Sequence, residues 1–145
     1  MEKISYRLYR DSDYQALIEF WQEAGLHIRP VGRDSRQSLA IQASQPMMHL
    51  LLAVEDQEIS GTVIVTHDGR KGWINRLATA PRLRRTGLAK ELIRQAEAWL
   101  RQQGIHIYTC LIEDWNTSSR ALFLGMDYVE HRDIIYYSKR ENNNV

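Results

Sequence analysis

Three strand-like stretches follow one another between residues 48 and 80, and they limit this chain to a fold built on a β-sheet. Met48–Val54 is an almost unbroken apolar run, which is typical of a strand covered on both faces. Ile59–Thr66 and Trp73–Ala80 follow it with the composition of strands. Short polar turns separate the three stretches, and the second turn carries the hairpin signal Asp68-Gly69. We therefore expect three neighbouring antiparallel strands.

A long amphipathic helix is expected directly after these strands. Residues 87–103 carry an apolar stripe at helical spacing, and Gly104 stands where a helix commonly ends. Residues 105–112 then have the composition of another strand. A strand, a helix and a strand in succession favour a crossover that adds a parallel strand to the sheet. The stripe consists of Leu88, Leu92, Ala96, Trp99 and Leu100.

The remaining segments complete one domain over residues 1–138, followed by a flexible tail at 139–145. We expect a mixed, mostly antiparallel sheet of six to seven strands with about four helices packed on both faces, an α/β (α+β) fold. The first helix follows Ser12 and Gln15, which have capping-box spacing. The other elements are expected as a strand at 4–9, a first helix ending at Gly25, a loop at 27–34, helices at 36–43 and 117–124, and a closing pair of strands at 128–137.

Composition excludes several classes of protein. The 145 residues suffice for one domain, and 19 basic against 18 acidic residues leave a net charge of +1, which favours neither nucleic acid nor a membrane as partner. The single cysteine, Cys110, forms no intrachain disulfide, reads as a small buried apolar residue, and has no neighbour at zinc-ligand spacing. The first residues lack the apolar core of a signal peptide, so we expect a cytoplasmic protein by default.

The loop before the long helix carries the clearest chemistry. The first N–H groups of a helix have no internal partners and form the positive end of the helix dipole. Arg82, Arg84, Arg85 and Lys90 surround that helix start, and Gly87 leaves room for a ligand to approach the backbone. These features together predict a site for a phosphate-bearing ligand.

The motif Arg84-x-x-Gly87-x-Ala89, placed after a strand and at the start of a long helix, resembles the acetyl-CoA signature of the GNAT N-acetyltransferase superfamily. In that superfamily the motif is Arg or Gln, two residues, Gly, one residue, then Gly or Ala. The order of elements is also similar from Tyr6 to Tyr137, and Asn116 stands where the family has an asparagine that contacts the cofactor. The hairpin at 67–73 is similar to that of the small bacterial subfamily typified by YpeA.

The resemblance implies an N-acetyltransferase that uses acetyl-CoA as co-substrate, without a metal, and transfers its acetyl group to a primary amine by direct attack in a ternary complex. It implies that the backbone of residues 77–79 pairs with the pantetheine arm and that residues 85–90 hold the pyrophosphate. The strands that contain Thr79 and Ile112 would splay apart, with the thioester in the gap. The cofactor-binding residues implied are Leu77, Ala78, Thr79, Arg84, Arg85, Thr86, Gly87, Leu88, Ala89, Lys90, Asn116 and Phe123.

The sequence departs from the family at the catalytic positions. Phe123 occupies the position of the usual tyrosine that protonates the leaving thiolate, and phenylalanine has no proton to donate. The thiolate would then leave unassisted, or another tyrosine such as Tyr108 or Tyr128 would take this role. As general base, Glu113 is the nearest acid, and Asn75 is the alternative that orients a water.

The acceptor would be gripped by the segment His27–Asp34 and by the closing strands. Arg29 and Arg33 point to an acidic acceptor, whereas Asp34 and Glu130 would suit a cation, so both classes stay open. A homodimer is also left open. Two further functions compete with the enzyme: an acyl-CoA sensor with little or no turnover, and a nucleic-acid-binding domain that uses the arginine-rich loop.

Overall fold

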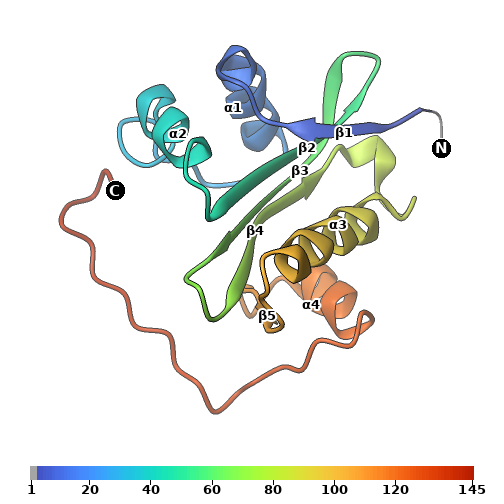
Figure 1. Cartoon of the computed structure of the whole chain (residues 1–145), viewed down its shortest axis with the longest axis vertical. Helices are drawn as coiled ribbons and strands as arrows, with labels where there is room; N and C mark the ends of the chain where they lie inside the picture. The colour runs from blue at the N-terminus through green and yellow to red at the C-terminus, as the bar shows by residue number, and fades with distance from the viewer. Residues whose placement is uncertain (1–2) are drawn as a thin grey trace.

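Five strands form one sheet in the order β1-β2-β3-β4-β5, with helices on both of its faces (Figure 1). The structure is a computed structural model and describes residues 3–145. Neighbouring strands are antiparallel from β1 to β4, and β5 lies parallel to β4 after the crossover through α3, as expected from the sequence. The elements are β1 (Ser5–Leu8), η1 (Asp11–Asp13), α1 (Tyr14–Glu23), α2 (Arg36–Ala43), β2 (Met48–Glu55), β3 (Glu58–His67), β4 (Gly72–Thr79), η2 (Pro81–Leu83), α3 (Leu88–Gln102), β5 (Tyr108–Thr109) and α4 (Thr117–Leu124).

The sheet is covered on both faces, which explains the unbroken apolar run of β2. On one face, Leu50 and Leu52 of β2 pack with α1 and α2, whose buried anchors are Trp21 and Leu39. The residues between them point the other way and pack against α3 and α4. That second cluster includes Leu51, Ala53, Val63, Leu88, Leu92, Leu100 and Phe123.

A β-bulge interrupts β4 in the middle of the sheet. Thr62 of β3 stands opposite Ala78, and Ile64 stands opposite Asn75, so two residues of β4 face one residue of β3. The bulge contains Arg76, whose φ of +52° lies in the left-handed region that side-chain-bearing residues rarely adopt. The bulge turns Arg76 toward the α1–α2 side, as its contacts below show.

The start of α1 differs from expectation. Instead of a box between Ser12 and Gln15, the carboxylate of Asp13 accepts the backbone N–H of Arg10 at 2.8 Å, and α1 begins at Tyr14. Asp13 also accepts two bonds from the Arg7 guanidinium, both at 2.8 Å. The Asp13 carboxylate therefore closes η1 and ties it to β1, and it makes no capping bond to α1.

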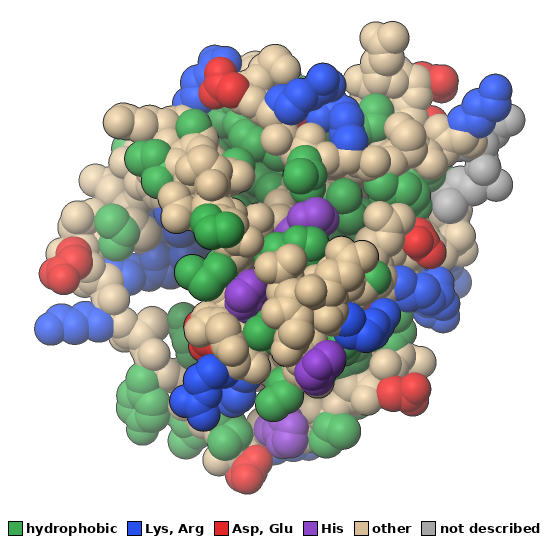
Figure 2. Space-filling view, in the orientation of Figure 1, with side chains coloured by type: hydrophobic (Ala, Val, Ile, Leu, Met, Phe, Trp, Pro, Cys, Tyr) green, Lys and Arg blue, Asp and Glu red, His purple; other side chains and the backbone are tan. Residues whose placement is uncertain are grey.

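The closing strands expected at 128–137 do not form, and that prediction was wrong. The chain runs on from α4 without regular structure, and hydrophobic side chains project from it along the lower left edge of Figure 2. Within the described residues the sheet therefore has five strands rather than six to seven. The strand expected at 105–112 shortens to Tyr108–Thr109, so the sheet offers only a short edge for further strands to pair with. The exposed apolar residues of this segment are Val129, Ile134, Ile135, Tyr136 and Tyr137.

Candidate active site

The edge of β4 beyond Trp73 is open, because β5 leaves it there. The two strands pair only at Gly72 with Tyr108 and at Trp73 with Thr109, whereas β4 continues to Thr79. Leu77, Ala78 and Thr79, the residues expected along the pantetheine arm, lie on this open edge. Ala78 is buried and its two neighbours are half-buried. The pairing of β4 with β5 thus ends well before Thr79, and the gap that the resemblance implies between β4 and the segment after β5 stays a prediction.

The loop between η2 and α3, together with the first turn of α3, presents six consecutive backbone amides. Within residues 3–145, the N–H groups from Arg85 to Lys90 find no acceptor, and the first helical bond of α3 is donated by Glu91 to the carbonyl of Gly87 at 3.0 Å. Gly87 is the N-cap and has a φ of +90°, which glycine adopts without strain. A Cβ added at Gly87 would meet no protein atom within 4 Å, so it would project into open space beside these amides.

The loop holds this shape through local contacts. Leu83 is buried in the α3-side core, and its carbonyl accepts the Thr86 hydroxyl at 2.5 Å. Arg85 lies in the left-handed region with a φ of +63°. Alternation of left-handed and ordinary residues turns successive amides toward one side and makes a concave anion site.

Positive side chains surround the amides. Arg84, Arg85 and Lys90 are exposed, and no ion pair engages them within residues 3–145. Arg82 differs, because its guanidinium lies 2.6 Å from the carboxylate of Glu55. Leu88 is buried, so it offers only its N–H, and Figure 2 shows basic side chains at the right-hand edge, where α3 begins. Charge and open amides thus coincide at one place.

Asn116 and Phe123 lie on α4. The Asn116 side-chain oxygen caps α4 by accepting the N–H of Ser119 at 3.2 Å, while its amide N–H₂ donates to no partner within the described residues. Phe123 is only 5% exposed and packs edge-on against Tyr128 with ring centroids 4.9 Å apart. The structure therefore places Phe123 in the core, and its side chain offers little surface to a ligand.

The two residues expected to serve catalysis are both exposed but lie on separate segments. Ile74 packs against α3, so strand alternation places Asn75 on the α1–α2 side of the sheet, beside the bulge. Glu113 lies in the connection between β5 and α4, where its backbone carbonyl accepts the N–H of Asn116 at 3.0 Å. No hydrogen bond joins the Asn75 and Glu113 side chains to each other.

Sequence reasoning missed the network that fixes the bulge. The Arg76 guanidinium donates to the carbonyl of His27 and to the carboxylate of Asp34, both at 2.9 Å, and it stacks over the ring of Trp21 at 4.9 Å. The backbone carbonyl of Arg76 accepts the Thr62 hydroxyl at 3.0 Å. Burial lowers the pKa of Arg76, against the opposing effect of Asp34. No local sequence pattern predicts these contacts, because the partners come from three different segments: α1, residues 27–34 and β3.

The two tyrosines considered as proton donors both face α3. Tyr128 donates its hydroxyl to the Glu97 carboxylate at 2.6 Å, and burial followed by this bond raises the pKa of Tyr128. Tyr108 receives a longer bond of 3.4 Å from Arg101. Burial raises the pKa of Cys110 to about 11, so its thiol stays protonated and this residue belongs to the core packing, as expected.

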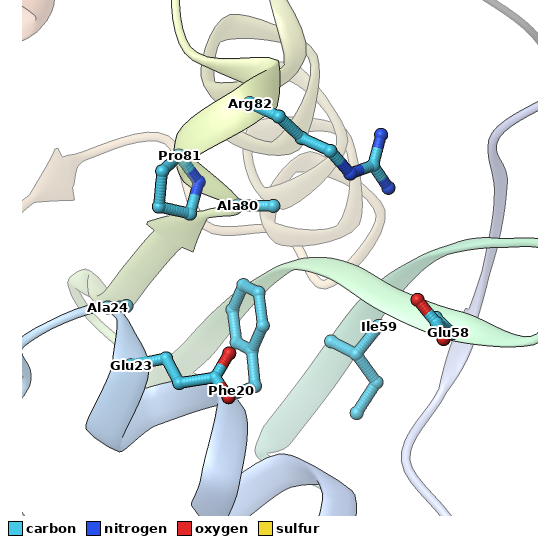
Figure 3. A pocket seen from close by; sticks show the side chains of 8 residues that line it. All are labelled: Phe20, Glu23, Ala24, Glu58, Ile59, Ala80, Pro81 and Arg82. Atoms are coloured by element: carbon cyan, nitrogen blue, oxygen red, sulfur yellow. The ribbon is translucent and has the colours of Figure 1, made fainter.

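A separate hollow opens on the α1 side of η2, with a volume of about 350 Å³. Figure 3 shows the ring of Phe20 between Ile59 and the end of β4, with Glu23 and Glu58 at the margins. None of the residues that line this hollow was expected to bind acetyl-CoA. Among the described residues, no group of three or more His, Cys, Asp or Glu side chains is placed to hold a metal ion. None of the helices in the described part has the length and apolarity needed to cross a membrane.

Comparison with known proteins agrees with this fold. Residues 7–126 match the model of the acetyltransferase (GNAT) family, and the chain belongs to that family. A transcriptional regulator from Bacillus halodurans has a similar fold at a TM-score of 0.81 and 12% identity, covering 94% of this chain and all of the other. A predicted acetyltransferase from Clostridium acetobutylicum, solved with acetyl-CoA, has a TM-score of 0.77 at 15% identity; the match covers 94% of this chain and 96% of that protein's chain. An aminoglycoside 6'-N-acetyltransferase from Acinetobacter haemolyticus has a TM-score of 0.77 at 19% identity; the match covers 95% of this chain and 99% of that protein's chain.

Proposed function

We propose that this protein transfers the acetyl group of acetyl-CoA to a primary amine. The observation that carries the proposal is the row of unpartnered amides from Arg85 to Lys90, ringed by free basic side chains, at the head of the open edge of β4. A diphosphate supplies the acceptor oxygens that these amides lack, and an extended amide arm can pair with an open strand edge. The bound thioester supplies an activated acetyl group.

Each part of the chain has a role in this proposal. The amides of residues 85–90 hold the pyrophosphate, with Arg84, Arg85 and Lys90 as counter-charges. Leu77 to Thr79 align the pantetheine arm along β4, and the free side-chain amide of Asn116 donates to the same ligand. The bulge at Arg76 then marks the place along β4 where the acetyl group is presented.

In the reaction, the amine nitrogen forms a bond to the acetyl carbonyl carbon, the carbon–sulfur bond breaks, and the amine proton goes to solvent through a base. Asn75 is exposed beside the bulge and is suited to orient a water for this proton. Glu113 remains the nearest acid in the connection after β5. The thiolate leaves without a protein proton, because Phe123 is buried and the Tyr128 hydroxyl is bound to Glu97. A thiol pKa of about 8.5 makes that departure tolerable.

The test is acetyl-CoA binding by calorimetry together with acetyl transfer to a panel of amines. Gly87→Glu places a carboxylate beside the amides and should abolish acetyl-CoA binding. Gly104→Glu is the matched control, because Gly104 has a φ of +79° at the other end of α3 and a Cβ there also meets no atom within 4 Å. Unchanged affinity in Gly87→Glu would overturn the assigned site. Tight binding without transfer to any amine would instead identify an acyl-CoA sensor.

A further inference from the structure

The segment between α1 and α2 lies against the bulge and is locked to it. Residues 27–35 contain one carboxylate, that of Asp34, and this carboxylate accepts both the Arg76 guanidinium at 2.9 Å and the backbone N–H of Arg29 at 2.7 Å. The Asp34 side chain is 5% exposed and that of Arg76 is 15% exposed. Asp34 is therefore engaged by the fold and offers little surface to a cationic ligand.

The same segment keeps two arginines without a counter-ion. No ion pair engages Arg29 or Arg33 within residues 3–145. Arg29 donates one bond of 3.2 Å to the backbone carbonyl of Asn143, and its Nε–H is buried without an acceptor. Arg33 is exposed, and it is close enough to Arg76 for its charge to add to the lowering of the Arg76 pKa that burial causes.

The second carboxylate that would have suited a cation is also occupied. Glu130 accepts from Arg120 at 3.0 Å and forms a further ion pair with Arg132. Glu23 and Glu58 line the hollow in Figure 3, beside Ala80. Ala80 lies four residues after Arg76, which corresponds to about 13 Å between the two residues along an extended strand. Of the charged side chains of residues 27–35, Arg29 and Arg33 are therefore the ones without an ion-pair partner, and the chain end at Asn144 and Val145 lies against Gly32 beside them.

We infer that the acceptor is an amine that also carries an anionic group, recognised by the Arg33 guanidinium while its amine reaches the bulge beside Asn75. This inference rests on the proposed function and adds the class of acceptor to it. A carboxylate or phosphate matches the planar donor fork of arginine, whereas a polycation would be repelled. The anionic group can belong to a small metabolite or to an acidic peptide with a free N-terminus, since both present the same chemistry.

The experiment compares amines that are matched except for charge. One set is γ-aminobutyrate, its neutral amide and putrescine; the other is the tripeptides Ala-Glu-Glu, Ala-Gln-Gln and Ala-Lys-Lys. The kcat/KM of acetyl transfer is measured for each, and the binding of each amine is measured separately in the presence of CoA, which cannot react. The two sets separate a metabolite from a peptide acceptor. Arg33→Glu is compared with Arg101→Glu, which makes the same charge change at the end of α3 on the opposite face of the sheet.

The anionic member of at least one set should exceed its cationic counterpart by about tenfold or more in kcat/KM and in affinity, because one charge-assisted hydrogen bond is lost or replaced by repulsion. Arg33→Glu should remove or reverse that preference, chiefly through KM, and Arg101→Glu should keep it. Equal or stronger binding of the cations, or a preference unaffected by Arg33→Glu, would overturn the inference. Transfer to cationic amines alone would overturn this inference but leave the proposed function standing. If the wild-type protein did not bind acetyl-CoA, the proposed function itself would fail.

Discussion

The Thr62 hydroxyl donates to the backbone carbonyl of Arg76 at 3.0 Å and at the same time accepts the indole N–H of Trp21 at 3.0 Å. Thr62 and Trp21 have no exposed surface. This relay ties α1 through β3 to the bulge of β4. The position along β4 where the acetyl group would lie is thus fixed by a buried threonine rather than by the bulge residue alone.

Replacing Thr62 should show that the relay stabilises the fold. Thr62→Val keeps the shape of the side chain but leaves the Trp21 N–H and the Arg76 carbonyl without partners in the core. We expect a loss of about 2–3 kcal/mol in the free energy of unfolding, measured by urea titration. Ser60→Ala is the matched control on the same strand, because the buried Ser60 hydroxyl has no partner to lose. A loss in Ser60→Ala as large as that in Thr62→Val would contradict the role given to the relay.

The buried ion pair between Arg76 and Asp34 should be costly to break from one side. Asp34→Asn leaves a largely buried guanidinium without its counter-charge, and we expect about 3 kcal/mol of destabilisation by urea titration. The comparison is Asp11→Asn, which breaks the exposed pair with Arg36 and should cost far less stability. Similar losses in the two variants would show that the Arg76 pair is not the lock of the α1–α2 segment.

Much of the fold was predictable from local patterns. The apolar run at 48–54 and the apolar stripe of α3 indicate which residues are buried, and the spacing of buried residues distinguishes a strand from a helix. The bulge was not predictable, because a left-handed arginine inside a strand has no compositional signal and is supported by Asp34, 42 residues away. The closing strands failed for a related reason: residues 128–137 have strand composition, but a strand also needs an edge to pair with.

The candidate site divides in the same way. The cofactor loop could be recognised because glycine, arginine and a helix start lie next to one another in the sequence, and the structure shows the open amides there. The acid and base could not be assigned, because their roles depend on which side chains meet across the gap. Phe123 illustrates this limit: its burial against Tyr128 arises from packing between α4 and the chain that follows it.

Tyr128 should contribute to stability rather than to proton transfer. Its raised pKa lies further above that of a thiol than the ordinary tyrosine pKa does, so donation to the leaving thiolate is uphill. Tyr128→Phe should cost about 1–2 kcal/mol by thermal or urea unfolding, because the Glu97 carboxylate loses its donor, and it should leave kcat nearly unchanged. Tyr108→Phe, which loses only a 3.4 Å bond, is the control for stability. If Tyr128→Phe alone slowed turnover by about two orders of magnitude or more, Tyr128 would instead be the general acid.

His49 should make the fold sensitive to mild acid. Its ring stacks on Trp99 with centroids 4.8 Å apart. Burial lowers the pKa of His49 below its usual value of about 6.5. Below that usual value the unfolded chain binds a proton that the folded protein does not, so the free energy of unfolding should fall as the pH drops from about 7 toward 5. His49→Gln should flatten this dependence in urea titrations, whereas His106→Gln, at an exposed position, should keep it. Parallel pH profiles for wild type and His49→Gln would show that His49 is not the group responsible.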